Sequence, residues 1–461
     1  MGFFSNGCFR ILTREFHMST NTDKPSKDRW MNVRQSIGIV VIALLLFAYY
    51  VYTWRGTGNF RIAIDRCSQT FCDFADYYYP MGESILQTRE PLTGFVYSPF
   101  IAFLFALFTP LGIDSALLLW GLLQGICILL FIGLFHRLIP TGWWIQLLFI
   151  FLALSSFPLL HNLVWGQVGI ITTVSILGAL FLYERGQRAL AAVLLAFGIS
   201  FKFFPLIFLL PFVIRRDLRF LLYSFIACAV FLIVIPAALL GMDGATRFYA
   251  ALFDSYRHFD WVIANYNSQH FPHVILRLAK ATGIDDAMLR LAISADFNPS
   301  MYLQILRWFS YSITALNAGL VYCIQRARLP HANLWSFHIL FLTVPFVLLT
   351  SWPVDLVYIS FAQGLLAWQL VEEQKEIRAS RITSSILLLA SIIISNIVFF
   401  NLLGNRNLYG SSGITFWSNA LLLAASYVEL LPIAFRQIRI ATNSKILPSR
   451  SASVRTVNLN S

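Results

Sequence analysis

Apolar runs long enough to cross a lipid bilayer recur along most of the chain. Each run holds about 17 to 25 residues, enough for a helix to cross a hydrocarbon core about 30 Å thick. Strands of a membrane barrel would instead alternate polar and apolar residues over about ten positions. Hydrophobic residues make up 58% of the 461 residues and charged residues only 12%, a composition that a soluble domain could not bury. We therefore predict an all-α, polytopic membrane protein.

The basic residues predict which ends of these runs face the cytoplasm. Lys and Arg cluster before the first run, 36–54, so the positive-inside rule keeps the N-terminal segment, residues 1–35, in the cytoplasm. Basic cytoplasmic loops also explain the net charge of +12 without nucleic-acid binding. The apolar piece 97–111 is too short to span. The remaining runs are 115–135, 143–160, 163–183, 190–214, 220–240, 301–323, 333–350, 354–370, 382–400 and 414–435.

The run 190–214 is flanked by basic residues on both sides, so it should leave the cytoplasmic side and return to it. Lys202 to Pro205 interrupts it, because proline removes a backbone donor and disfavours helix at the preceding residue. Counting its halves separately gives about 12 passes. We expect a plasma-membrane protein with both termini cytoplasmic, a membrane domain at 36–435 with extracytoplasmic loops at 55–110 and 241–300, and a disordered basic tail at 436–461.

Two of the six cysteines lie together in the first outer loop. Cys67 and Cys72 are close in sequence and next to Asp73. If this loop faces an oxidising compartment, a short disulfide between them is a reasonable hypothesis.

Polar residues gather at the predicted outer side of this otherwise apolar chain. Charge within a membrane is energetically costly and usually serves a function. Asp73 and Asp76 are three residues apart, so on a short α-helix they would share one face. Together with them, residues from distant parts of the chain could build one polar pocket. These are Tyr97, Gln167, Lys202, Asn267, Gln269, His270, Arg277, Trp352 and Asp355.

Each of these residues also has a structural interpretation. Asp73 could pair with a loop arginine, and Gln167 could support a helix–helix contact. Lys202 could extend to lipid head groups. Asp355 could be satisfied by the helix N-terminus after Pro353. His270 and Arg277 could anchor the head groups of anionic lipids.

Several short motifs follow one another along the chain. They are Asp73-Phe74-Ala75-Asp76-Tyr77-Tyr78, Phe95-Val96-Tyr97-Ser98-Pro99-Phe100, Trp165-Gly166-Gln167-Val168-Gly169, Gly198 to Lys202 with Pro205, Asn267-Ser268-Gln269-His270 with Arg277, and Thr350-Ser351-Trp352-Pro353. Their order resembles glycosyltransferase family 87, a C-type family that includes polyprenol-phosphate-mannose-dependent α-mannosyltransferases. The likeness covers roughly residues 36–370. The chain has Gly169 where the family often carries Asn, and Phe203 where it often carries Pro.

The resemblance implies transfer of a hexose from a polyprenyl-phosphate sugar donor to a lipid or glycan acceptor hydroxyl on the outer face. Mannose is the leading candidate for this hexose. Asp73 would act as general base with inversion at the anomeric carbon. Lys202, His270 and Arg277 would bind the donor phosphate. The resemblance calls for no metal and no cofactor. Residues that contact substrate or support the site would be Asp76, Tyr97, Gln167, Asn267, Gln269, Trp352 and Asp355.

Two other functions use similar features. A transporter or flippase of a lipid-linked or anionic substrate also places charges within the membrane, but transporters often carry paired broken helices, and we find one broken run without a matching partner. A ligase of the O-antigen type would differ in its donor, which is a diphosphate-linked glycan.

Overall fold

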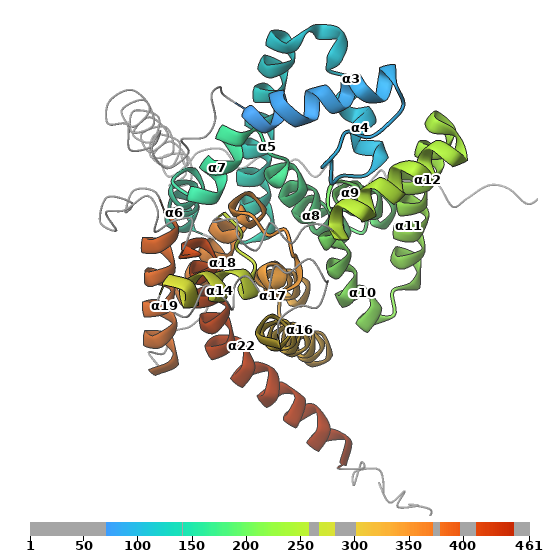
Figure 1. The fold of residues 1–461 in the computed structure, drawn as a ribbon. Helices are drawn as coiled ribbons and strands as arrows, with labels where there is room; N and C mark the ends of the chain where they lie inside the picture. Colours follow the sequence, from blue (N-terminus) through green and yellow to red (C-terminus); the bar gives the residue numbers. More distant parts are fainter. Residues whose placement is uncertain are drawn as a thin grey trace, which may run out of the picture.

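The computed structural model describes residues 71–140, 142–257, 267–281, 301–371, 379–396 and 412–446. The first predicted span (36–54), the N-terminal segment (1–35), Cys67 and parts of both outer loops lie outside these ranges. Within them the chain is helical, and β structure is limited to one isolated bridge between Ser156 and Asn396. The all-α prediction is therefore confirmed for this part of the chain (Figure 1).

Within each described range the helices follow one another with short connections. The first half contains η1 (Phe74–Tyr78), α3 (Tyr79–Gln87), α4 (Pro99–Ala106), η2 (Thr109–Leu111), α5 (Ile113–Leu138), α6 (Trp143–Leu154), α7 (Phe157–Trp165), α8 (Gly169–Glu184), α9 (Arg188–Phe201), η3 (Phe204–Leu209), α10 (Leu210–Arg215), α11 (Leu218–Ala229), η4 (Val230–Val234) and α12 (Ile235–Arg257). The second half contains α14 (Phe271–Ala281), α16 (Met301–Ala327), α17 (Ala332–Val347), η5 (Pro353–Leu356), α18 (Ile359–Val371), α19 (Ala379–Ser395) and α22 (Ile414–Ile446).

Four segments of the described chain are long and apolar enough to cross a membrane. They are Ile113–Leu138, Leu218–Tyr256, Pro353–Val371 and Ile414–Arg436. The second of these bends at Gly241, whose backbone has φ 75° and ψ 163°. A left-handed φ costs glycine little, so the chain can turn there at the boundary where the sequence predicted the end of a span.

Three basic connections between the predicted runs, 184–188, 215–219 and 325–328, lie at one end of the molecule. The Arg188 side chain, which begins α9, lies 3.1 Å from the carboxylate of Asp217, just after α10. Asn333 donates to Glu184 at 2.6 Å, which adds the start of α17 to this end. Both flanks of the 190–214 run therefore lie at the same end of the molecule, and the chain turns back between them. The break also falls where expected: α9 ends at Phe201, Lys202 is extended, and η3 begins at Phe204.

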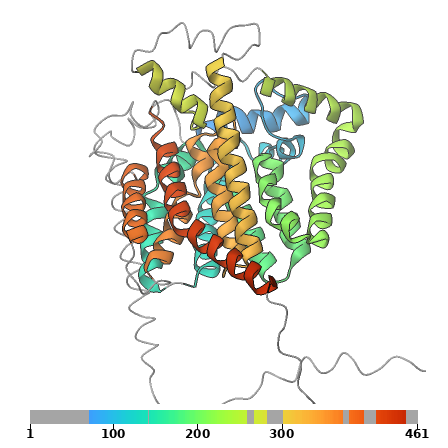
Figure 2. The same ribbon diagram turned by 90° about the horizontal axis from the view of Figure 1, so that it is seen from below.

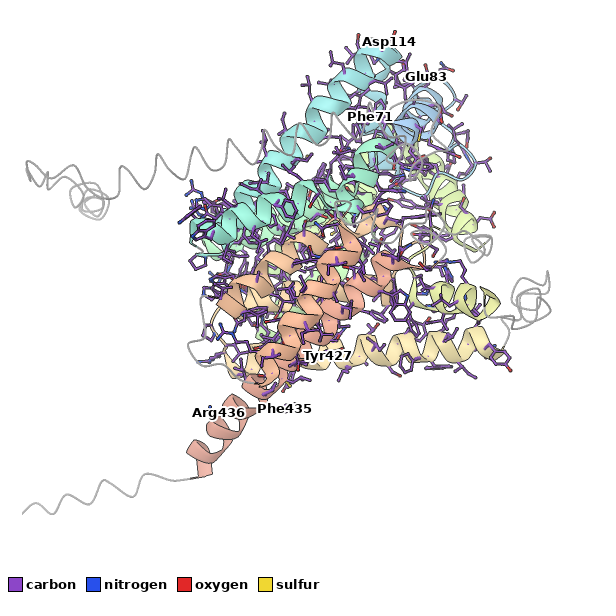
Figure 3. All side chains as sticks on the ribbon, turned by 90° about the vertical axis from the view of Figure 1, so that its left-hand side faces the viewer. Phe71, Glu83, Asp114, Tyr427, Phe435 and Arg436 are labelled. Atoms are coloured by element: carbon purple, nitrogen blue, oxygen red, sulfur yellow. The ribbon has the colours of Figure 1, made fainter. Side chains whose placement is uncertain are left out.

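Shorter helices cover the opposite end. In Figure 2, α3 and the part of α12 that follows the bend at Gly241 run across the end of the bundle that α11 and α16 build. The helix α4 has eight residues, or about 12 Å of rise, so it cannot cross a bilayer. This agrees with the prediction that 97–111 does not span. In Figure 3, Phe71, Glu83 and Asp114 mark this end, and Arg436 lies at the other.

Two predicted spans have different boundaries in the structure. The runs 143–160 and 163–183 are three helices, α6, α7 and α8, rather than two. Pro158 lies in the first turn of α7, where its missing N–H costs nothing, so α7 starts anew after α6 ends at Leu154. Gly166, with φ 66°, ends α7. At the C-terminus, α22 continues past Phe435, where we placed the start of an irregular tail, to Ile446 (Figure 3).

Candidate active site

A cavity of about 650 Å³ opens at the end opposite the basic connections. Helices α8 and α9 relate the two ends, because each has one terminus at the basic end and the other at the cavity. Among the described residues of the lining, Asp73 is the only carboxylate and Lys202 the only Lys or Arg. The other polar and aromatic lining residues include Tyr77, Tyr78, Tyr97, His161, Trp165, Gln167, Tyr256, Asn267, Thr350 and Trp352.

Asp73 lies immediately before a π-helical turn, η1, which sets its direction. In this turn the N–H of Tyr79 bonds to the carbonyl of Phe74, an i→i+5 bond that widens the helix. Residues four and five positions after Asp73, namely Tyr77 and Tyr78, therefore share its face and line the cavity with it. Asp76, three positions on, is exposed and not part of the lining. The expectation that the two aspartates share a face was wrong, because it assumed α-helical spacing.

Gln167 connects Asp73 to two tyrosines. Its amide nitrogen donates to the carboxylate of Asp73. Its amide oxygen accepts from the hydroxyls of Tyr78 at 2.8 Å and Tyr97 at 3.3 Å. The two hydroxyls lie 2.6 Å apart. These bonds fix the amide group of Gln167 in one orientation. The amide bonds to Oδ2 of Asp73, and Oδ1 takes no part in this bond.

Buried amides inside the helices hold Gln167 in turn. Gln124, in the middle of α5, donates to the backbone carbonyl of Gln167 at 2.8 Å. Asn162 donates to the side-chain oxygen of Gln124 at 3.0 Å and accepts from the N–H of Ile170 at 3.2 Å. This network satisfies the backbone of the α7–α8 turn, so the turn that carries Gln167 has a defined shape.

Two glycines permit this turn. At Gly166 a Cβ would lie 2.7 Å from the Cβ of Phe71, and the backbone is left-handed. At Gly169 a Cβ would collide with the carbonyl oxygen of Val354. The start of α8 can therefore approach η5 only without a side chain at 169, which is the physical reason why this chain carries glycine there rather than asparagine.

The environment of Asp73 raises the pKa of its carboxyl from 3.8 to about 6. The largest cause is burial, which disfavours the charged form. The hydrogen bond from Gln167 acts in the opposite direction, the nearby Asp76 raises the pKa further, and Lys202 lowers it. A carboxyl with a pKa near 6 is ionised at neutral pH and is a much better proton acceptor than an ordinary aspartate.

Lys202 enters the cavity from the break between α9 and η3. Its ammonium forms an ion pair with Asp355, and the side chains are 10% and 1% exposed. The same ammonium lies 5.9 Å from the centre of the Tyr97 ring. Asp355 also accepts from the N–H of Trp352 at 3.1 Å at the start of η5. The helix-capping interpretation of Asp355 was therefore correct, and Asp355 holds Lys202 as well.

The structure does not bring two predicted phosphate ligands to the cavity lining. His270 is 5% exposed, and its Nδ1 lies 2.9 Å from the carbonyl oxygen of Pro345. Arg277 donates to the carbonyl of Ser268. Gln269 is buried, its N–H bonds to Ser351, and its amide oxygen accepts from Phe416. These residues fix the connection that precedes α14, whereas Asn267, just before them, does line the cavity.

Sequence reasoning missed several residues of this site. Tyr78 was part of a quoted motif, yet its hydroxyl was not assigned a role. Gln124 lies in the middle of a predicted span, and an amide at that depth is itself a signal of buried function. Trp165 opens the quoted motif that contains Gln167, and His161 lies four residues before Trp165, yet neither side chain was assigned a role. Among the described residues, no group of three or more His, Cys, Asp or Glu side chains is arranged to hold a metal ion.

Cys72, the residue before Asp73, is disulfide-bonded. Its predicted partner, Cys67, lies outside the described residues.

Comparison with protein families gives a match to glycosyltransferase family 87 over residues 95–351. This segment is more than half of the chain. The chain belongs to glycosyltransferase family 87. No curated protein matches it.

Family membership makes the chain a membrane glycosyltransferase, which uses a sugar donor and an acceptor. The matched segment contains Tyr97, Gln167 and Lys202, and so most of the cavity. Asp73 lies before the start of the matched segment, and its hydrogen bond with Gln167 connects it to the part of the cavity that the segment forms.

Proposed function

We propose that this membrane glycosyltransferase moves a hexose from a polyprenyl-phosphate sugar to a hydroxyl of a lipid or glycan acceptor, and mannose is the leading candidate for the hexose. The observation that carries the proposal is that, among the described lining residues of one mostly apolar cavity, a carboxylate of raised pKa occurs together with a lysine. A base and an anion-binding group are what transfer from a lipid phosphate requires.

Asp73 is the proposed general base. The acceptor oxygen attacks the anomeric carbon while its proton passes to the carboxylate of Asp73. The bond between the anomeric carbon and the phosphate oxygen breaks, and polyprenyl phosphate leaves with the electron pair. Asp73 is the only carboxylate among the described lining residues, so none of the others could act as a second, nucleophilic carboxylate. This favours a single displacement with inversion.

Lys202 is the proposed phosphate ligand. In the structure Asp355 holds its ammonium at the cavity wall, so the cation is positioned before any substrate binds. A phosphate at this wall would face a fixed positive charge in surroundings that screen it poorly. Phe203 and Phe204 follow Lys202 and line the same cavity, which suits an isoprenoid chain next to its phosphate.

The proposed location is the extracytoplasmic face of the plasma membrane. Support comes from the basic connections, which lie at the end away from the cavity and which the positive-inside rule assigns to the cytoplasm. The disulfide-bonded Cys72 next to Asp73 agrees with an oxidising compartment on the cavity side.

Transfer of label tests this function directly. Purified protein in lipid nanodiscs is given labelled polyprenyl-phosphate mannose, glucose or galactose together with the host's lipid extract. We expect a labelled product from one of these donors and none from the corresponding nucleotide sugars. A wild-type protein that uses only nucleotide sugars, or that moves the donor across the bilayer without forming a product, would contradict the proposal.

The pH dependence of the same reaction reports on Asp73. Because the base must be deprotonated, kcat/KM should fall with unit slope as the pH drops through about 6. Asp76→Asn removes a charge that raises the pKa of Asp73, so the acidic limb should move to lower pH. Gln167→Leu removes a hydrogen bond that lowers this pKa, so the limb should move to higher pH. Limbs that coincide in all three proteins would exclude Asp73 as the titrating group.

A further inference from the structure

Two aromatic residues of α7 line the cavity, and each has a buried polar atom without a hydrogen-bond partner among the described residues. His161 and Trp165 are four residues apart, and both line the cavity. Their rings stack, with centroids 5.5 Å apart and planes 13° apart. Within the described part of the chain, neither Nδ1 of His161 nor Nε1 of Trp165 has a hydrogen-bond partner, although both atoms are buried. His161 as a whole is 6% exposed.

Neighbouring contacts fix this pair in place. Asn162, the residue after His161, is bonded to Gln124 and to the N–H of Ile170. Gly166, the residue after Trp165, ends the helix and accepts from Trp120 through its carbonyl at 2.9 Å. Hydrogen bonds therefore hold the residues that follow His161 and Trp165, while Nδ1 of His161 and Nε1 of Trp165 have no partner among the described residues. Buried polar atoms in native proteins nearly always have partners, so an unpartnered pair at a cavity wall indicates a ligand.

The chemistry of the pair restricts the ligand. A tryptophan Nε1 can only donate, whereas an imidazole nitrogen can donate or accept, so together they suit hydroxyl groups, which do both. The stacked rings offer a flat apolar surface next to these atoms. A pyranose ring has the matching form, with an apolar C–H face and hydroxyls along its edge. A bare phosphate or an isoprenoid chain would use only one of the two features.

We propose that His161 and Trp165 form the sugar-binding wall of the cavity, on which a pyranose ring stacks while its hydroxyls bond to Nδ1 and Nε1. The inference rests on the proposed function and specifies which residues recognise the sugar. It gives the cavity three separate regions: Lys202 for the phosphate, Asp73 for the acceptor proton, and the α7 pair for the pyranose. The ring belongs to either the donor or the acceptor, and the two sources can be separated by experiment.

Binding measurements test the pair independently of turnover. His161→Phe and Trp165→Phe each keep an aromatic ring and remove the polar atom. Affinities in nanodiscs are measured for the polyprenyl-phosphate hexose that wild type uses, for sugar-free polyprenyl phosphate, and for the octyl glycosides of the same hexose as acceptor mimics. Trp308→Phe, on the exposed surface of α16, is the matched control.

We expect each variant to bind one sugar-bearing ligand about tenfold more weakly than wild type, and to bind sugar-free polyprenyl phosphate unchanged. Unchanged binding of the sugar-free lipid also shows that the variant is folded. A loss in the hexose-donor arm places the donor sugar on the pair, and a loss in the octyl-glycoside arm places the acceptor there. If both variants bind every sugar ligand as wild type does, the inference is overturned while transfer by wild type still upholds the proposed function. If wild type transfers no sugar and prefers no sugar-bearing ligand, both fall.

Discussion

Replacing Asp73 with Asn should reduce sugar transfer by about 10² to 10⁴-fold, the range that a general base contributes. The substitution keeps the size of the side chain and an oxygen that can accept from Gln167, so the network with Tyr78 and Tyr97 should persist. What is lost is the ability to take the proton of the acceptor hydroxyl. The loss should therefore appear in kcat and kcat/KM, with little change in donor affinity.

A matched control separates the chemistry from the charge. Asp114→Asn removes a carboxylate from the exposed first turn of α5, outside the cavity lining, and should leave transfer within about twofold of wild type. Both variants are compared with wild type by label transfer and by thermal unfolding in nanodiscs. A folded Asp73→Asn protein that transfers sugar at the wild-type rate would remove Asp73 from the mechanism, while family membership would stand.

The fold was predictable where local chemistry decides it. Apolar length predicted the helical class, and the positive-inside rule correctly placed both flanks of the 190–214 run together because charge is costly in a bilayer. Pro205 and Gly241 mark breaks that the backbone itself imposes. The break before Phe157 was missed, because the serines preceding it carry no such constraint and Pro158 is also compatible with the first turn of a helix.

The site was predictable only in part, because its geometry depends on tertiary contacts. Polar side chains among apolar residues are energetically costly, so they stand out in the sequence. Three such residues were predicted to belong to the site and do line one cavity: Asp73, Gln167 and Lys202. Spacing arguments failed at Asp76, since the π-helical turn is invisible in the sequence. His270 and Arg277 were expected to bind phosphate, but their side chains bond to nearby carbonyls in the folded chain.

Replacing Lys202 with Met should lower kcat/KM by about 10² to 10³-fold, the effect of removing one donor that stabilises developing negative charge. It should also destabilise the protein. The substitution leaves Asp355 buried without its cation, and breaking a buried ion pair from one side costs about 3 to 5 kcal/mol. Asp355→Leu should cost a similar amount, because it leaves the ammonium of Lys202 unpaired.

The double variant separates these two consequences. With Lys202→Met and Asp355→Leu together no buried charge remains unpaired, so most of the lost free energy of unfolding should return, since an apolar pair often replaces a buried ion pair at little cost. The double variant should stay below wild type by about 1 kcal/mol, because the N–H of Trp352 loses its bond to Asp355. Activity should not return, because the phosphate still has no cation. Arg188→Met is the matched control: it breaks the Arg188–Asp217 pair, whose arginine side chain is 45% exposed, and should cost under about 1 kcal/mol. A double variant that regains transfer together with stability would show that Lys202 serves the fold alone, and the phosphate would then need another ligand.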